Sequence, residues 1–235
     1  MRGMKLLAIE GSTAWLSVCA YDGQPVATAR ERSGANASER ILEFVQRALA
    51  EARWRLDELD GIAYGSGPGA FTGLRVVCGA VQGLALGAGL PVTGVPSLLS
   101  MAQAAWRRHD ATRVVACLDA RMHEVYLGAY RRVDGDWLIE VEPTVARPAD
   151  VAAPALGTAG WFGAGDGFAA APTLAARLAP AGVDAAIVPE AVHVAELAVP
   201  KFAAGGGRPA DEAQPLYVRH RVALTEAERA AGARL

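Results

Sequence analysis

The fold is decided close to the N-terminus, where residues 5–30 read KLLAIEGSTAWLSVCAYDGQPVATAR. Two short runs of strand-forming residues, 5–9 and 15–21, flank the polar turn 10–13. Asp22-Gly23 is a strong hairpin signal, because both residue types tolerate the backbone of a tight turn, and a third strand-like run follows at 25–30. The stretch therefore predicts a three-strand antiparallel meander.

The pattern changes at Ser38, where apolar residues begin to recur with a period near 3.6. We predict Ser38 as the N-cap of an amphipathic helix of about four turns. Its apolar face comprises Ile41, Leu42, Val45, Ala48, Leu49 and Ala52. The next predicted elements are a short strand at 61–64, a glycine-rich loop at 65–69, a helix at 72–87, an extended segment at 90–95 and a helix at 97–107.

Three strands, a helix, a strand, a helix and a further strand form a ribonuclease-H-like unit, the building block of actin-like ATPases. The second half repeats a looser version, with strands at 114–118, 124–130, 137–141 and 158–163 and a helix at 193–203. We therefore predict an α/β chain with the two-lobed actin-like ATPase fold, a duplicated ribonuclease-H-like architecture of mixed sheets with flanking helices. The predicted division is an N-terminal lobe at 1–108, a second, smaller lobe at 109–188, and a helix and tail at 189–235 that pack back on the first lobe.

The composition is that of a folded protein without a strongly charged surface. The 235 residues are 52% hydrophobic and 20% charged, which is enough apolar material for a sizeable core. The formal net charge is −2, so the chain as a whole has no electrostatic reason to bind a phosphate backbone. Three cysteines lie far apart without a Cys-x-x-Cys pair, which is typical of buried side chains in a reducing, cytoplasmic compartment.

Charged residues are absent between Arg75 and Arg107, which raises the question of a membrane span. A spanning helix needs about 20 continuous, mainly apolar residues. This window is interrupted too often for that, and we expect buried soluble structure and no membrane association. The interrupting residues are Gly79, Gly83, Gly87, Gly89, Pro91, Gly94 and Pro96.

The most distinctive local motif is GSGPGAFTG at 65–73, which connects a predicted strand to a predicted helix. Backbone amides at such a junction can cradle phosphate. No Lys-Ser or Lys-Thr follows the last glycine, so the P-loop pattern fails. The dinucleotide fingerprint fails too, because no acidic residue occurs between Asp60 and Asp110. A structural tight turn and a contact surface both remain open.

The following helix carries glycine at every fourth position, Gly79, Gly83 and Gly87. Glycine inside a helix costs about 1 kcal/mol relative to alanine, so three along one face need a compensating gain. Close approach of another backbone is that gain. The partner is either the protein's own sheet or first helix, or the helices of another subunit that pack on a flat surface formed by this helix and the first.

An enzyme is the main alternative: an actin-like small-molecule kinase or peptidase that acts alone, with Glu10, Asp119 or Asp166 as acid/base groups. The turn 119–124 concentrates charge, but a solvated turn with a local ion pair explains it as well. No metal is expected, because none of the four histidines has a His or Cys partner at helical ligand spacing. The tail 214–221 combines a tyrosine with basic residues, which fits a docked segment or contact with RNA.

Five blocks resemble the bacterial TsaB (YeaZ) family of tRNA threonylcarbamoyladenosine biosynthesis proteins. They are LLAIEGST at 6–13, AYGSGPGAFTGLR at 63–75, QGLA at 82–85, LDARMHEVY at 118–126 and PLYVR at 215–219. The blocks span nearly the whole chain, while 143–200 matches weakly.

The resemblance implies a two-lobed actin-like protein that has lost catalysis, needs no cofactor and serves as a partner subunit. Its expected partners are a TsaD-like transferase in a heterodimer and a TsaE-like ATPase in the larger complex, with a homodimer when alone and only indirect contact with tRNA. Glu10-Gly11 stands where Asp-Thr is common, and Ala70 where serine is common, which weighs against nucleotide binding.

The resemblance also places the partner surface on the first two helices. The residues expected there are Ile41, Leu42, Val45, Leu49, Arg75, Val76, Gly79, Ala80, Gly83, Leu86 and Gly87.

Overall fold

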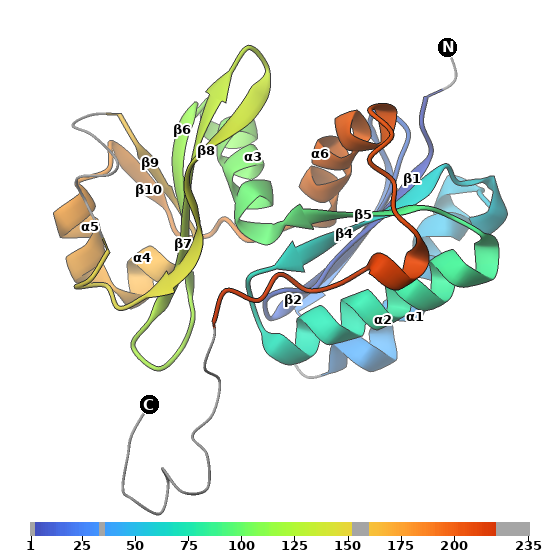
Figure 1. The fold of residues 1–235 in the computed structure, drawn as a ribbon, viewed down its shortest axis with the longest axis horizontal. Helices are drawn as coiled ribbons and strands as arrows, with labels where there is room; N and C mark the ends of the chain where they lie inside the picture. The colour runs from blue at the N-terminus through green and yellow to red at the C-terminus, as the bar shows by residue number, and fades with distance from the viewer. Residues whose placement is uncertain (1–2, 33–35, 152–159, 220–235) are drawn as a thin grey trace, which may run out of the picture.

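The computed structural model describes residues 3–32, 36–151 and 160–219. Two lobes lie side by side, each built on a five-stranded mixed sheet (Figure 1). The first sheet contains β1 (Leu6–Glu10), β2 (Trp15–Tyr21), β3 (Pro25–Arg32), β4 (Gly61–Gly67) and β5 (Val92–Pro96). The second contains β6 (Arg113–Asp119), β7 (Val125–Val133), β8 (Asp136–Ala146), β9 (Phe162–Ala164) and β10 (Gly182–Asp184).

The two sheets repeat one topology. The strand order is β3-β2-β1-β4-β5 in the first and β8-β7-β6-β9-β10 in the second. In both, the first three strands of the unit pair antiparallel and the last two join in parallel. This is the ribonuclease-H-like order in duplicate, and it confirms the predicted fold class.

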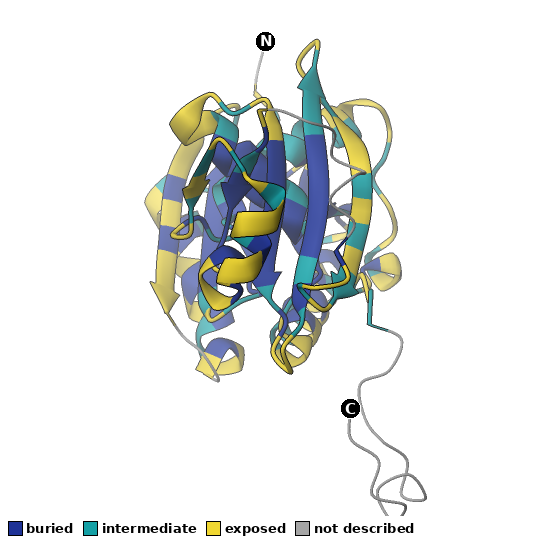
Figure 2. Cartoon of the chain, turned by 90° about the vertical axis from the view of Figure 1, so that its left-hand side faces the viewer, coloured by how far each residue is buried: buried dark blue, intermediate teal, exposed yellow. Residues whose placement is uncertain are grey.

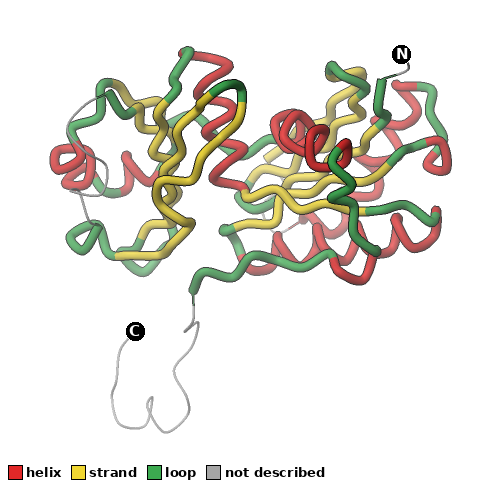
Figure 3. Tube along the Cα trace, turned by 45° about the horizontal axis from the view of Figure 1, so that its top comes forward, coloured by secondary structure: helices red, strands yellow, loops and turns green. Residues whose placement is uncertain are grey.

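Helices cover both faces of each sheet. On the first sheet, α1 (Ala37–Ala52) and α2 (Phe71–Ala88) lie on one face and α6 (Ala191–Ala203) on the other (Figures 1 and 3). Strand β1 is buried throughout because alternate side chains point to opposite faces. Leu7 and Ile9 pack in the core beneath α1 and α2, whereas Leu6 and Ala8 pack against α6.

The second sheet is covered by α3 (Ser97–His109) on one face and by α4 (Gly167–Ala170) and α5 (Pro172–Leu178) on the other. Figure 2 views this lobe from its outer side, where strands with buried residues lie behind the short helices. The lobe boundary predicted at 108 falls inside α3, whose Leu98 and Met101 share a core with β6 and β7. We therefore propose the boundary ahead of α3.

Three local expectations needed correction. Helix α1 begins at Ala37 after Asn36, so Ser38 lies inside the first turn and is not the N-cap. Strand β4 continues to Gly67, three residues into the predicted loop. The strand expected at 158–163 is β9, and residues 158 and 159 lie outside the described ranges. Helices α4 and α5 and strand β10 were not predicted, because they are short and lack a clear periodicity.

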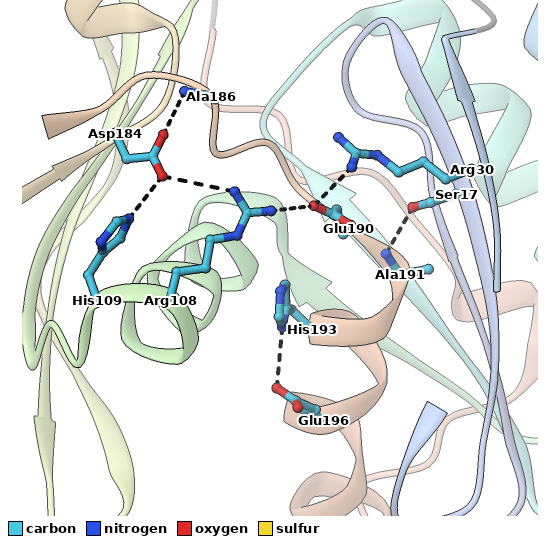
Figure 4. A network of polar contacts seen from close by, with 10 residues as sticks. All are labelled: Ser17, Arg30, Arg108, His109, Asp184, Ala186, Glu190, Ala191, His193 and Glu196. Carbon is cyan, nitrogen blue, oxygen red and sulfur yellow. Dashed lines mark hydrogen bonds and ion pairs between the residues drawn. The ribbon is translucent and has the colours of Figure 1, made fainter. Parts of the chain in front are cut away.

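Polar contacts join the lobes at α3 and α6 (Figure 4). Asp184 of β10 accepts from His109 at 2.9 Å and lies 3.9 Å from Arg108. Arg108 in turn contacts Glu190 at 3.1 Å, and Glu190 lies 3.4 Å from Arg30 of β3. The chain of charges thus runs from the second sheet to the first.

The segment 213–219 forms a second connection, which we call the C-terminal strap. It follows a short 3-10 helix (Ala210–Glu212) and runs along α2 towards the second lobe (Figure 1). Leu216 donates its N–H to the Ser66 carbonyl at 2.7 Å, on the first lobe. Arg219 donates to Glu124 at 2.6 Å and to the Ala120 carbonyl at 3.0 Å, on the second.

Candidate protein-docking surface

The glycine stripe of α2 faces away from the protein. Gly79, Gly83 and Gly87 are exposed, and a Cβ added at any of them meets no heavy atom within 4 Å. The explanation in which the stripe packs on the protein's own sheet or first helix is therefore wrong. At these three positions the helix backbone is exposed on the molecular surface.

Apolar side chains flank the stripe. Leu86 is 78% exposed, and Leu42 of the neighbouring α1 is 52% exposed. Leu49, Val76 and Ala80 are half-buried, between the core and the surface. Arg75 is the single charged residue in the 18 residues of α2. We call this set of α1 and α2 residues, together with the three glycines, the docking surface.

Two residues expected on this surface do not belong to it. Ile41 is 3% exposed and Val45 is 2% exposed, and both lie in the core between α1 and the first sheet. A 3.6-residue period shows which residues share a helix face but not what covers that face. The neighbouring Leu42 is turned outward instead, so α1 contributes to the surface through Leu42 and the half-buried Leu49.

The inner face of α2 explains its hydrophobicity. Five of its residues are buried against the sheet and α1: Leu74, Val77, Cys78, Val81 and Ala85. By length and composition α2 could cross a membrane, with a mean hydropathy of 1.4 over 18 residues. Its contribution to the core marks it as a packed helix of the first lobe, and its other face leaves an apolar side chain and bare glycine backbone exposed.

An aromatic cluster extends the surface at the N-terminal end of α2. The Arg75 guanidinium lies 3.9 Å from the Phe71 ring centroid and donates to the Tyr217 hydroxyl at 3.1 Å. The Phe71 and Tyr217 rings are 5.7 Å apart. Phe71 is 43% exposed and Tyr217 48%. Sequence reasoning placed both in notable motifs but missed their pairing, because they are 146 positions apart.

A pocket of about 460 Å³ opens between the lobes and is partly roofed by the strap. It brings Asp119 and Asp166 together with Ser12 and Thr13, so two of the three proposed acid/base residues do meet here. Asp166 accepts the Asp119 N–H at 3.0 Å, and Asp119 pairs with Arg121 at 3.0 Å. The ion pair was one of the two explanations considered for the turn 119–124.

Glu10 does not line this pocket, because it lies in the core and is 1% exposed. One carboxyl oxygen accepts the Ser12 N–H, and the other accepts from the Ser97 hydroxyl at 2.9 Å. Gly65 makes room for it, since a Cβ there would lie 1.7 Å from Glu10 Oε2. Burial raises the pKa of Glu10 above its ordinary 4.5, although hydrogen bonds from Ser12 and Ser97 act the other way. The carboxyl group is a packed part of the first lobe.

The described residues hold no cluster of three metal-ligating side chains. Of the tail expected to dock or to contact RNA, the described part ends at Arg219, whose guanidinium is bound by Glu124. His220 and Arg221 lie outside the described ranges.

Comparison with known proteins gives a consistent result. Residues 31–213 match the family model of TsaD, described as tRNA N6-adenosine threonylcarbamoyltransferase. The tRNA threonylcarbamoyladenosine biosynthesis protein TsaB of Escherichia coli is 38% identical over 223 residues, which cover 94% of this chain and 96% of that protein. The protein of the same name from Haemophilus influenzae is 36% identical, with the same coverage.

A solved structure agrees over the whole fold. YeaZ from Pseudomonas aeruginosa superposes with a TM-score of 0.83 and 38% sequence identity, covering 91% of this chain and 99% of that one. The duplicated sheet topology and the actin-like ATPase fold are thus common to both. The chain belongs to the TsaB (YeaZ) family.

Proposed function

We propose that this chain is a non-catalytic subunit of the bacterial machinery that makes threonylcarbamoyladenosine in tRNA, and that it binds and stabilises a TsaD-type transferase through the docking surface. The observation that carries the proposal is the exposed glycine stripe with its flanking leucines. Family membership supplies the reaction in which such a subunit takes part.

The surface has the physical properties of a helix-packing interface. Two helices pack with their axes 8–10 Å apart, and the closer distances need small residues at the contact. Gly79, Gly83 and Gly87 leave a strip of α2 without side chains. Leu86 stands beside it, and burial of a leucine side chain contributes about 1.5–3 kcal/mol. The glycines would let a partner's helix approach α2 closely, and Leu86 would be buried in that contact.

The match to the TsaD model suggests what those helices are. A transferase of that family is expected to share the first-lobe architecture, because residues 31–213 match its model. Related lobes can then meet through equivalent helices about a twofold-like axis, as in an isologous dimer. The same geometry accounts for a homodimer of this chain when the transferase is absent.

The remaining partners follow from the same proposal. A TsaE-like ATPase joins the pair, tRNA is contacted mainly by the transferase, and the complex acts in the cytoplasm. The near-neutral charge of the chain supports an indirect role with tRNA, because 23 basic and 25 acidic side chains leave no general attraction to phosphate.

The test is the mass of the particle formed when this chain is mixed with its TsaD-type transferase at micromolar concentration, measured by size-exclusion chromatography with light scattering. A 1:1 complex is expected. Leu86→Asp should weaken it by at least about 100-fold, because a carboxylate would be desolvated in the interface. The matched control is Leu138→Asp on β8 of the other lobe, where the leucine is 46% exposed. Equal effects of the two variants would contradict the proposed surface.

A further inference from the structure

The exposed residues of α2 form a symmetric set. Helix α2 lies on the outside of the first lobe (Figure 1). The residues exposed along it, which we call the α2 seam, are Phe71, Thr72, Arg75, Gly79, Gly83, Leu86 and Gly87. Gly79 is the middle member, and the others form pairs at equal sequence distances on its two sides. The seam therefore reads the same in both directions as far as exposure is concerned.

Each pair combines a larger side chain with a smaller one. The pairs are Phe71 with Gly87, Arg75 with Gly83 and Leu86 with Thr72. A Cβ added at Gly79, Gly83 or Gly87 meets no heavy atom within 4 Å, so the space beside these positions lies outside the molecule. Each bulky position thus has a small residue at the corresponding place across Gly79.

This pattern fits a second copy of α2 that lies antiparallel across the first. With a twofold axis at Gly79, each member of a pair faces the other member on the second copy. The long Arg75 side chain then crosses the bare backbone at Gly83. Leu86, which is 78% exposed, packs against the small Thr72. Large side chains of one helix thereby enter the gaps of the other, as in ordinary helix packing.

Charge also favours the antiparallel arrangement. Arg75 is the single charged residue of α2, and its guanidinium lies 3.9 Å from the Phe71 ring centroid, towards the N-terminal end of the helix. An antiparallel copy brings its α2 C-terminus to this end, where main-chain carbonyls carry partial negative charge and the last turn has no basic residue. A parallel copy would instead place two Arg75 side chains face to face, with mutual repulsion.

The arginine is held in position before any partner binds. It stacks on Phe71 and donates to the Tyr217 hydroxyl at 3.1 Å. A side chain that is already ordered loses less rotamer freedom on association. Tyr217 is 48% exposed beside Phe71, so the C-terminal strap adds an aromatic ring to the same end of the seam.

We propose that two copies of this chain pair through antiparallel α2 seams, with Gly79 at the twofold axis and with Phe71, Arg75 and Leu86 of each copy seated on the small residues of the other. The proposal rests on the docking surface put forward above. It adds to that surface an orientation, a register and the side chains that meet.

Disulfide cross-linking of the full chain tests the register. Gly79→Cys and Gly83→Cys are oxidised at micromolar concentration, and the dimer is followed on non-reducing gels. A disulfide needs Cα atoms about 4.4–6.8 Å apart. Residue 79 meets its own copy at the axis, so Gly79→Cys should cross-link. The wild type is the blank, because Cys19, Cys78 and Cys117 are buried.

Gly83→Cys is the matched control, since Gly83 is exposed on the same helix with the same open space around it. At about 1.5 Å per residue, the two copies of residue 83 lie about 12 Å apart along the antiparallel pair. Gly83→Cys should therefore cross-link at least about 10-fold more slowly than Gly79→Cys. In a parallel pair, residue 83 would meet its own copy and the two variants would cross-link alike.

A mixture of Thr72→Cys and Leu86→Cys provides a second test that leaves the glycines intact. The two variants should cross-link with each other, and neither should do so alone. If Gly79→Cys fails to fold by circular dichroism, this mixture decides. The proposal is overturned if Gly83→Cys cross-links as fast as Gly79→Cys, if the mixture yields no dimer, or if light scattering shows only monomer at high micromolar concentration. Transferase binding is measured separately with Leu86→Asp, so these failures leave the proposed function standing.

Discussion

At the scale of single residues, glycines do two opposite things in this protein. Gly65 is obligatory for the core, because any side chain there would collide with the buried Glu10 carboxyl group. Gly83 is unnecessary for the core, because nothing lies within 4 Å of its added Cβ. An exposed helical glycine costs about 1 kcal/mol relative to alanine. The three glycines therefore lower the stability of α2 and leave its outer face without side chains at these positions.

Glu10 provides a residue-scale prediction about pH. Its folded-state pKa is raised above 4.5, so above that pH the folded chain retains a proton that the unfolded chain has lost. The free energy of unfolding of the wild type should therefore fall as pH rises from 4.5 through the folded-state pKa, by at most about 1.4 kcal/mol per pH unit. Glu10→Gln cannot ionise, so its stability relative to wild type should increase over this range.

Urea unfolding of both proteins between pH 5 and 8 measures this difference. Glu39→Gln, which alters an exposed carboxyl group in the first turn of α1, serves as the control and should run parallel to the wild type. A constant offset between Glu10→Gln and the wild type would show that the Glu10 carboxyl group does not hold its proton in the folded state.

At the scale of elements, the C-terminal strap links the two lobes through few but well-formed contacts. Tyr64 holds it on the first lobe, where its hydroxyl accepts the Gln214 N–H at 3.0 Å and contacts the Gln214 carbonyl at 3.3 Å. Gln82 of α2 donates to the Ala213 carbonyl at 3.0 Å. The strap therefore connects α2 to the β6–β7 turn, with which Arg219 forms hydrogen bonds.

Arg219→Ala tests this link. Hydrogen bonds to charged groups contribute about 1.5–3 kcal/mol, so loss of the Glu124 and Ala120 contacts should speed hydrogen exchange of the strap amides by about 10-fold or more. Exchange in β4 should not change. The control is Arg121→Ala in the same turn, whose side chain is 86% exposed and, among the described residues, forms an ion pair with Asp119 alone. Unchanged strap exchange in Arg219→Ala would mean that the strap is held by its first-lobe contacts alone.

The regular elements could be predicted because their patterns are strong. Strand β2 was predicted at its observed bounds, since a seven-residue run of mainly strand-forming residues ends at the Asp22-Gly23 turn. Helices α4 and α5 carry only one or two turns each, and their positions depend on packing against β6 and β7 that local sequence does not encode.

The candidate site was predicted in part. The glycine spacing indicated that one face of α2 makes a close backbone contact. Because glycine contributes nothing to a hydrophobic pattern, the sequence did not show whether that face points into the protein or away from it. For the same reason Ile41 and Val45 were grouped with Leu42, although the core covers the first two and leaves the third exposed. The aromatic contact of Tyr217 with Phe71 depends on the path of the strap, which no local pattern reveals.

At the scale of the whole molecule, the duplicated fold separates two surfaces. The docking surface lies on the α1 and α2 face of the first sheet, and α6 covers the opposite face of that sheet, beside the second lobe (Figure 1). A transferase seated on the docking surface would leave the α6 face uncovered.

The central claim is that the glycine stripe exists for contact with another protein, and the affinity of Gly83→Leu for the TsaD-type transferase tests it most directly. Because the added side chain enters open space, the variant should fold, with circular dichroism and a free energy of unfolding close to or above those of the wild type. Its association should nevertheless be weakened by at least about 100-fold, since a leucine would hold the two helices apart. A folded Gly83→Leu protein that binds the transferase as tightly as the wild type would contradict the account.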